Sequence, residues 1–147
     1  MKVLFIGGTG TISSACSRVA DEAGLDLYLL NRGQTSRPIP DNVQILRGDI
    51  RQIESAQHAL QDHVWDAVVN WIAFTPEHIV TDLNLFRNRT RQYIFMSSAS
   101  AYQKPLSSLP ITESTLVANP YWLYSRQKIA CEERLMRAYR EEGFPFT

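Results

Sequence analysis

The sequence predicts a doubly wound α/β fold, in which a parallel sheet carries helices on both faces. Along its 147 residues, short apolar runs rich in strand-forming residues alternate with stretches of helical character. A glycine turn, Gly7-Gly8-Thr9-Gly10, follows the first apolar run directly, and Tyr124 and Lys128 lie four residues apart in the last helical stretch. In such a sheet ligands bind beyond the carboxyl ends of the strands, and these features lie at a strand end and on the final helix.

The first strand ends at the glycine turn. Residues 3–6 are apolar and strand-forming, so we expect a buried strand that the glycines terminate. Because glycine has no Cβ, the backbone can turn tightly and a pyrophosphate can approach it. The next helix presents unpaired N–H groups and the positive end of its dipole. The turn therefore predicts an anion site made of backbone, the alternative being a tight turn that binds no ligand.

The second strand and a loop follow the first helix. That helix covers residues 11–23 and ends at Gly24, and residues 25–30 form the second strand. Residues 31–42 are polar and contain one glycine and two prolines, which predicts a loop.

The middle of the chain repeats the alternation. Residues 43–47 form the third strand, residues 53–62 a helix and residues 65–72 the fourth strand. The next helix begins with Thr75 as its cap and Pro76 at its first position, where the missing N–H of proline has no cost.

A long connection precedes the last helix. Residues 91–96 form the fifth strand, and residues 97–118 form a loop of a length that is typical of functional segments. Asn119-Pro120 repeats the signal of a cap followed by proline, so we expect a helix from there to Glu142 that Gly143 ends. The residues after Gly143 are typical of the start of another buried strand.

Composition favours a single globular domain. Fifteen basic residues balance fifteen acidic ones, so no overall charge attracts the chain to nucleic acid or anionic lipid. Cys16 and Cys131 lack the spacing of a metal or redox pair, which indicates free thiols in a reducing compartment. The first apolar run is too short for a signal or membrane segment, so we expect a cytoplasmic protein. The histidines His58, His63 and His78 are scattered, and no metal site is expected.

Four motifs follow one another in a particular order. They are Gly7-x-x-Gly10 after the first strand, Gly48-Asp49-Ile50 after the third, Ser97-Ser98-Ala99-Ser100-Ala101-Tyr102 after the fifth, and Tyr124-x-x-x-Lys128 in the last helix. In this order they resemble the extended short-chain dehydrogenase/reductase superfamily, specifically its NAD-dependent epimerase/dehydratase branch. The resemblance implies a dinucleotide-binding Rossmann domain over residues 1–147. Extended members continue into a substrate-binding region, so we expect this chain to be a fragment that stops before the sixth strand.

The resemblance implies hydride transfer with Ser98, Tyr124 and Lys128 as catalytic residues. In the family the matching tyrosine removes the proton of a substrate hydroxyl as hydride leaves for the nicotinamide. The matching lysine also holds the nicotinamide ribose, and the serine orients the substrate oxygen. Tyr124 and Lys128 lie on one face of a helix, where the ammonium favours the phenolate. The alternatives are a surface helical pair and an ordinary turn serine.

The resemblance also implies a set of cofactor contacts. They are Gly7, Gly10, Thr11, Ile12, Asn31, Arg32, Asp49, Ile50, Ala73 and Lys128. An acidic residue at the end of the second strand usually holds the ribose hydroxyls of NAD, whereas this chain has Asn31 and Arg32 there. Arg32 can meet a 2′-phosphate, which favours NADP. In the alternative, the cofactor is NAD, Asn31 serves through its amide and Arg32 is solvated.

Two segments depart from the family pattern. Ser13 stands where a third glycine allows close packing of helix on sheet, which we expect to weaken cofactor binding more than abolish it. Bulky residues at 71–74 replace the small-residue run after the fourth strand, although Ala73 is retained. Tyr102, Tyr121 and Trp122 either shape a substrate pocket or belong to the core or an interface.

Two functions fit these observations. The first is an NAD(P)-dependent epimerase, dehydratase or reductase that acts on a nucleotide sugar or similar alcohol, the 147-residue chain by itself being inactive. The second is a non-catalytic relative that uses the dinucleotide as a structural or sensing ligand and binds a protein or RNA partner, although the balanced charge argues against RNA. The resemblance further implies a homodimer through the helices after the fourth and fifth strands, the second of which is the last helix of this chain. This helix carries Ile129, Leu135, Met136 and Tyr139, and the alternative is that these residues face the sheet.

Overall fold

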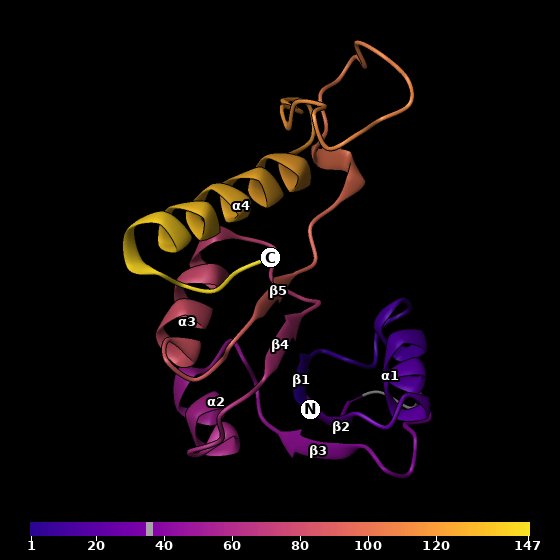
Figure 1. The fold of residues 1–147 in the computed structure, drawn as a ribbon, viewed down its shortest axis with the longest axis vertical. Coiled ribbons are helices and arrows are strands. Elements are labelled where there is room, and N and C mark those ends of the chain that lie inside the picture. The colour runs from indigo at the N-terminus through magenta and orange to yellow at the C-terminus, as the bar shows by residue number, and fades with distance from the viewer. Residues whose placement is uncertain (35–36) are drawn as a thin grey trace.

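The fold is a five-stranded parallel sheet with helices on both faces, as the sequence predicts (Figure 1). The computed structural model describes residues 1–34 and 37–147. Its strands are β1 (Lys2–Ile6), β2 (Asp26–Asn31), β3 (Gln44–Arg47), β4 (Ala67–Asn70) and β5 (Tyr93–Phe95). Its helices are α1 (Ser13–Glu22), α2 (Ile53–Leu60), α3 (Pro76–Phe86) and α4 (Leu123–Glu142), and a short 3₁₀ helix, η1, spans Ala99–Ala101. The strands lie in the order β3-β2-β1-β4-β5, and every neighbouring pair is parallel.

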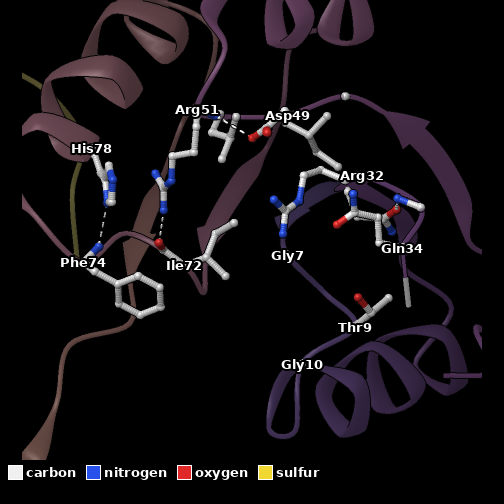
Figure 2. Close-up of a pocket in the computed structure, with 15 residues that line it drawn as sticks. Gly7, Thr9, Gly10, Arg32, Gln34, Asp49, Arg51, Ile72, Phe74 and His78 are labelled. Carbon is white, nitrogen blue, oxygen red and sulfur yellow. Dashed lines mark hydrogen bonds between the residues drawn. The ribbon is translucent and has the colours of Figure 1, made fainter. Parts of the chain in front are cut away.

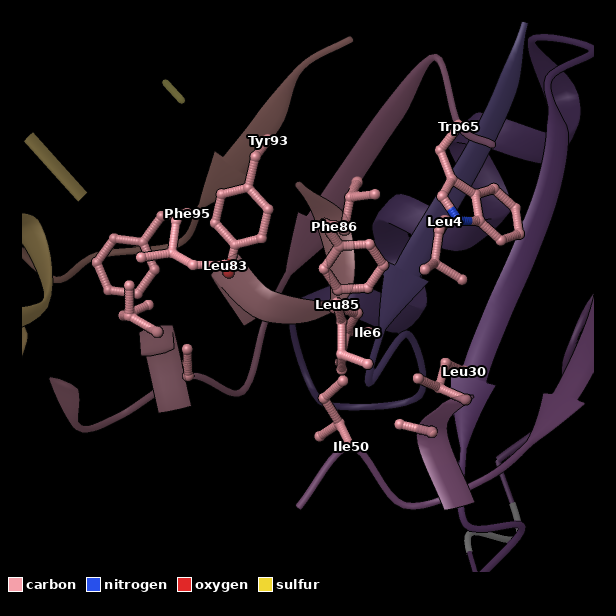
Figure 3. Packing of buried hydrophobic residues seen from close by; sticks show 14 of the residues in the cluster. Leu4, Ile6, Leu30, Ile50, Trp65, Leu83, Leu85, Phe86, Tyr93 and Phe95 are labelled. Carbon is pink, nitrogen blue, oxygen red and sulfur yellow. The ribbon is translucent and has the colours of Figure 1, made fainter. Parts of the chain in front are cut away.

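The two faces of the sheet carry separate hydrophobic cores. Leu4 and Ile6 of β1 point into the larger core, which α2, α3 and α4 cover and part of which Figure 3 shows. Val3 and Phe5 point into the smaller core on the other face, because successive side chains of a strand alternate. Helix α1 covers that face (Figure 1), with Ala20 packed against the strands. Burial on both faces explains why the strands are apolar runs without polar alternation.

Strand β4 covers Ala67–Asn70, so the expected strand over residues 65–72 is too long. The side-chain oxygen of Asn70 accepts hydrogen bonds from the backbone amides of Ile72 and Ala73, at 2.8 and 2.9 Å. These bonds form a local turn of the kind that asparagine favours, and they end the strand at Asn70.

Helix α4 begins at Leu123, so the expected start at Asn119-Pro120 is wrong. The Asn119 side chain is engaged elsewhere. Its oxygen accepts a hydrogen bond from the amide of Tyr121 at 3.1 Å, and its Nδ2 donates to the carbonyl of Ser100 at 2.7 Å. Asn119 therefore ties the segment before α4 to η1 and does not cap the helix.

Other helix boundaries follow the local signals. Helix α3 has Thr75 as its N-cap and Pro76 at its first position, as expected. Helix α4 ends at Gly143, whose φ of 67° lies in the left-handed region that glycine adopts without strain.

The last residues lie beside β5, at the edge of the sheet. The amide of Tyr93 donates to the carbonyl of Pro145 at 2.7 Å, and the amide of Thr147 donates to the carbonyl of Tyr93 at 2.8 Å. Strand-like pairing is therefore present after α4, as an isolated parallel bridge between Tyr93 and Phe146.

Both cysteines are free thiols, as expected. Cys131 is buried, and burial raises the pKa of its thiol to about 11, so it packs as a neutral side chain. Within residues 1–34 and 37–147, no helix is both long and apolar enough to cross a membrane.

Candidate functional site

A pocket of about 620 Å³ opens at the carboxyl end of the sheet (Figure 2). The chain runs outward from β1 to β2 and β3 on one side and places β4 and β5 on the other, so the pocket lies where the strand order reverses. Its lining comes from the ends of β1, β2 and β3, the turn after β4 and the start of α3. The lining residues are Gly7, Thr9, Gly10, Leu30, Asn31, Arg32, Gly33, Gln34, Gly48, Asp49, Ile50, Arg51, Ile72, Phe74 and His78.

The glycine turn needs glycine for two reasons. Gly7 has a φ of 90°, and a Cβ at this position would lie 2.7 Å from the Ile72 side chain. A Cβ on Gly8 would lie 2.5 Å from the Leu29 side chain, in the core under the turn. The turn is therefore pressed against the sheet, with its backbone facing the pocket.

Two serines of α1 brace this turn. The Ser13 hydroxyl accepts from the amide of Gly10 at 2.8 Å and donates to the carbonyl of Gly7 at 3.0 Å. The Ser17 hydroxyl donates to the carbonyl of Gly8 at 2.8 Å. Ser13, which replaces the family's third glycine, thus packs beneath the turn and holds its two ends together.

The first turn of α1 leaves backbone donors unpaired. Ile12 is the N-cap and provides no side-chain cap, and no acidic residue lies in the first turn. Within the described residues, the amides of Thr11 and Ile12 meet no acceptor. The helix therefore presents free N–H groups and the positive end of its dipole at the rim of the pocket.

The end of β2 contributes an unpartnered donor. The Asn31 side-chain oxygen accepts from the amide of Gly33 at 2.9 Å, while its Nδ2 is buried and has no hydrogen-bond partner among the described residues. Arg32 follows and also lines the pocket. A buried amide group without a partner is costly unless a ligand completes it.

The loop after β3 lies next to the end of β2 and continues the same wall of the pocket. The Asp49 carboxylate accepts from the amide of Arg51 at 2.9 Å, and Ile50 is buried at the pocket surface. The Arg51 guanidinium reaches across to the carbonyl of Ile72 (Figure 2), and partial burial lowers its pKa. Arg51 thereby links the loop after β3 to the turn after β4.

That turn rests on a buried polar group. Asp82 of α3 accepts hydrogen bonds from the Nδ2 of Asn70, at 2.5 Å, and from the Tyr93 hydroxyl. Burial raises the pKa of the Asp82 carboxyl to about 7. The hydrogen bond from Asn70 Nδ2 to Asp82 orients the Asn70 side-chain amide. In this orientation the Asn70 oxygen faces the backbone amides of the turn.

Lys128 of α4 lies behind the same turn. Its Nζ donates to the carbonyls of Ala73, at 2.8 Å, and Met96, at 2.6 Å, and the residue is only 1 % exposed. Desolvation lowers the pKa of its ammonium. Rings surround the charge, with Nζ 4.5 Å from the centroid of Phe95, 5.1 Å from that of Phe74 and 5.9 Å from that of Tyr124.

Hydrogen bonds bring Ser98 to the beginning of α4. The hydroxyls of Ser98 and Ser100 lie 2.8 Å apart, and the Ser125 hydroxyl donates to that of Ser100 at 3.0 Å. This row of hydroxyls connects the segment after β5 to Ser125, the residue that follows Tyr124 in the chain. The sequence motifs did not single out Ser125, and they indicated Asn119 only as a helix cap, because the contacts of both residues join distant segments.

The expected cofactor residues fall into three groups. Gly7, Gly10, Asn31, Arg32, Asp49 and Ile50 line the pocket. Thr11 and Ile12 lie at its rim, on the segment that leads into α1. Ala73, Lys128 and the expected catalytic residues Ser98 and Tyr124 are not in the pocket lining; Ala73 belongs to the turn after β4, and the other three lie beyond that turn.

The sequence motifs did not identify several residues of the pocket. The three aromatic residues considered for a substrate pocket do not line this one. The missed residues include Arg51, whose only signal was its place after Gly48-Asp49-Ile50, and His78 on the first turn of α3. Tyr102, Tyr121 and Trp122 are absent from the pocket lining.

Comparisons with known proteins agree with this architecture. A model of the family described as "NAD dependent epimerase/dehydratase family" matches residues 3–147. The UDP-glucose 4-epimerase of Lactobacillus helveticus is 29% identical over 100% of this chain and 50% of its own length. That of Azospirillum brasilense is 29% identical over 97% of this chain and 46% of its own. The chain thus spans about half the length of these curated relatives.

Solved structures show the same fold at lower identity. UDP-glucose 4-epimerase from Bifidobacterium longum, in complex with NAD+ and UDP, matches with a TM-score of 0.85 and 19% identity, over 99% of this chain and 51% of that chain. The dTDP-glucose 4,6-dehydratase of Bacillus anthracis, in complex with NAD, matches with a TM-score of 0.82 and 19% identity, over 99% of this chain and 53% of that one.

Proposed function

Because the chain belongs to the NAD-dependent epimerase/dehydratase family, we propose that it is the dinucleotide-binding part of an enzyme that acts on a nucleotide sugar or a similar alcohol. The observation that carries the proposal is that three features suited to binding a ligand meet at one pocket. Each either leaves hydrogen-bond donors without a partner or lets a ligand approach the backbone closely. They are the glycine turn, the unpaired amides at the start of α1 and the unpartnered Nδ2 of Asn31.

The lining and rim of the pocket fit three parts of a dinucleotide. Gly7 and Gly10, with the amides of Thr11 and Ile12, would hold the pyrophosphate, because backbone donors and a helix N-terminus favour an anion. Asn31 would give its free amide hydrogens to an adenosine ribose hydroxyl. Asp49 and Ile50 would flank the adenine, with Ile50 offering an apolar surface beneath it.

Arg32 supports NADP as the preferred dinucleotide. It lines the pocket one residue after Asn31, where a guanidinium can pair with a 2′-phosphate through two hydrogen bonds. NAD is the alternative, because the donor of Asn31 can serve an unmodified ribose equally well. The family's description names NAD, and it does not decide between the two for this chain.

The catalytic part of the proposal assigns roles to Ser98, Tyr124 and Lys128. When bound, the nicotinamide accepts and returns a hydride. Tyr124 would take the proton of the substrate hydroxyl, and Ser98 would hold the same oxygen by a hydrogen bond. Lys128 would place its positive charge beside the reacting groups, since its Nζ lies 5.9 Å from the centroid of the Tyr124 ring.

Lys128 retains one donor for a cofactor hydroxyl. An ammonium has three N–H groups, and two of them go to the carbonyls of Ala73 and Met96. The third would reach the nicotinamide ribose. Those two carbonyls also fix the height of the ammonium above the sheet, so the position of Lys128 depends on the ends of β4 and β5.

The burial of Lys128 favours a second candidate as well. A lysine that is 1 % exposed and engaged by two carbonyls also acts as a clamp between strand ends. In this second candidate the protein is not an enzyme. Lys128 and the bound dinucleotide would instead stabilise the fold that a partner protein recognises. The two candidates differ in whether Tyr124 is needed for turnover.

Calorimetry with NADP and NAD tests the shared part of the proposal. We expect the 147-residue chain to bind at least one dinucleotide while turning over little substrate. Gly7→Val is the matched control, because a side chain there would collide with Ile72 and close the turn to a pyrophosphate. A folded wild-type chain that binds neither dinucleotide at millimolar concentration would contradict the proposal.

We also propose that α4 contributes to a homodimer. Ile129, Met136 and Tyr139 remain at least partly exposed, whereas Leu135 is fully buried in the core and is unavailable to a partner. The expectation that all four residues reach an interface is therefore wrong for Leu135, which faces the sheet.

A further inference from the structure

The Phe74 side chain stands between the pocket and the proposed catalytic pair. Phe74 lines the pocket, and Figure 2 shows its ring beneath the turn that carries Ile72. On its other side the ring centroid is 6.3 Å from that of Tyr124 and 5.1 Å from Nζ of Lys128. Neither Tyr124 nor Lys128 lines the pocket. The ring therefore separates the place of a dinucleotide from the groups that would act on it.

The backbone around Phe74 is held by side chains from three elements. The amide of Phe74 donates to Nδ1 of His78 at 3.0 Å. The preceding residue, Ala73, gives its amide to Asn70 and its carbonyl to Lys128. The main chain cannot move without breaking these bonds, so any movement at this position belongs to the side chain.

Of the two phenylalanine rings over the ammonium of Lys128, Phe74 is the one that can turn away. Phe95 is only 8 % exposed and belongs to the core, whereas Phe74 is 40 % exposed. Attraction between the ammonium and the ring face favours the present, covering position. The position is thus stabilised by charge and not by close packing.

We propose that Phe74 is a positioning residue that controls access of the nicotinamide end of a dinucleotide to Tyr124 and Lys128. The inference rests on the proposed function. In the covering position the ring shields the remaining donor of Lys128 from the pocket. Binding of the nicotinamide ribose requires the ring to rotate about its side-chain bonds, and the bound ribose hydroxyl then replaces the ring beside the ammonium.

This control acts on one end of the ligand only. The adenosine end would lie against Asn31, Arg32 and Ile50, on the wall of the pocket that belongs to β2 and β3. If only a fraction of molecules has the ring turned aside, the apparent affinity for the whole dinucleotide equals its intrinsic affinity multiplied by that fraction. The affinity for ADP, which carries no nicotinamide ribose, is unaffected.

The ratio of NAD to ADP affinity tests the inference. We expect Phe74→Ala to raise the affinity of the 147-residue chain for NAD by roughly threefold or more, with the affinity for ADP within about twofold of the wild type. Phe74→Leu keeps apolar bulk but loses the ring face, so the rise for NAD is smaller. Trp122→Ala is the matched control, because it removes a ring that also contacts Tyr124, at 4.9 Å, from outside the pocket lining.

Binding is measured by calorimetry, and thermal melting by circular dichroism verifies that each variant is folded. The inference is overturned if Phe74→Ala lowers the affinity for NAD, leaves it unchanged, or changes the affinities for NAD and ADP by the same factor. If Phe74→Ala does not fold, the same criteria apply to Phe74→Leu. A wild-type chain that binds neither ligand contradicts the proposed function itself and removes the inference with it.

Discussion

In the proposed function, the adjacent side chains of Asn31 and Arg32 would define the cofactor. The oxygen of Asn31 accepts a hydrogen bond, while its nitrogen has no partner among residues 1–34 and 37–147, so it would offer a donor where an acidic residue would offer an acceptor. An amide donor needs an oxygen partner and adds no negative charge, which makes the site tolerant of a phosphate. Arg32 then adds a positive charge to the same wall of the pocket.

Arg32→Asp is expected to weaken NADP binding far more than NAD binding. Loss of a charge-assisted contact to a 2′-phosphate costs on the order of 1.5 to 3 kcal/mol, and NAD has no phosphate at that position. Calorimetry with both dinucleotides gives the two affinities. Arg18→Asp, an equal change of charge on the exposed face of α1, is the control. An equal loss for NADP and NAD would show that Arg32 does not recognise the phosphate.

Tyr124→Phe is expected to slow the hydride step of the active enzyme by roughly a hundredfold or more while leaving cofactor affinity nearly unchanged. The substitution removes the proton-accepting oxygen but keeps the ring contacts with Phe74 and Trp122. Single-turnover kinetics and calorimetry separate the two effects. Full activity of this variant would exclude Tyr124 as the proton acceptor.

Lys128→Met is expected to damage both turnover and binding. It removes the hydrogen bonds to the carbonyls of Ala73 and Met96, so the ends of β4 and β5 lose a shared anchor. Unfolding in urea should show a loss of stability that Tyr124→Phe does not show. If both variants behave like the wild type, neither residue has a catalytic role.

At the scale of elements, local pattern predicts the strands and the glycine turn well. The apolar runs of β1 and β2 are buried on both faces, and the Thr75-Pro76 signal marks the start of α3 correctly. The Asn119-Pro120 signal has the same local form and fails. Its asparagine finds partners in η1, a contact over 19 residues that propensity does not contain.

The same limit applies to the candidate site. The motifs identify the glycine turn and the ends of β2 and β3, because those contacts involve backbone at known offsets. They do not reveal that Arg51 reaches Ile72, or that Phe74 covers Lys128. These contacts depend on how the turn after β4 is folded, and that turn is set by Asn70 and the buried Asp82.

The buried Asp82, which supports this turn, predicts that the stability of the chain falls as the pH rises. Burial raises the pKa of Asp82 from 3.8 to about 7, so between these values the folded chain retains a proton that the unfolded chain has released. Stability from Asp82 is therefore fully present below about pH 4 and is lost as the pH rises through 7, by on the order of 4 kcal/mol in total.

Asp82→Asn removes this titration and serves as the reference. We expect the free energy of unfolding in urea, relative to Asp82→Asn, to be higher for the wild type at pH 5 than at pH 8, by on the order of 2 to 3 kcal/mol. The comparison cancels the titration of other groups, such as His63 and His78, which both variants contain. Parallel pH profiles for the two proteins would show that Asp82 does not hold a proton in the folded state.

For the molecule as a whole, the sheet places the candidate pocket and the proposed dimer surface on different sides. The pocket lies at the carboxyl edge of the strands, while α4 lies along the side of the molecule beyond β5 (Figure 1). The outer surface of α4 and the last residues enclose a shallow groove whose lining includes Ile129, Met136 and Phe146. A partner bound there would leave the pocket open, so association and cofactor binding are compatible.

The final prediction concerns self-association through α4. Met136 and Tyr139 are 40 % and 55 % exposed, and their burial by a second copy would remove apolar surface from water. We expect light scattering to show a dimer at high concentration. The double variant Met136→Glu with Tyr139→Glu should raise the dissociation constant of the dimer, because it buries unpaired like charges at a two-fold contact. The expected loss of association free energy is about 2 kcal/mol or more. Val19→Glu is the control, since Val19 is similarly exposed but lies on α1, against the opposite face of the sheet.

A wild-type monomer, or equal weakening by the control, would contradict an interface on α4. Loss of the dimer in the double variant alone would assign the interface to this helix, and unchanged NAD binding in the same variant would confirm that the pocket does not depend on it.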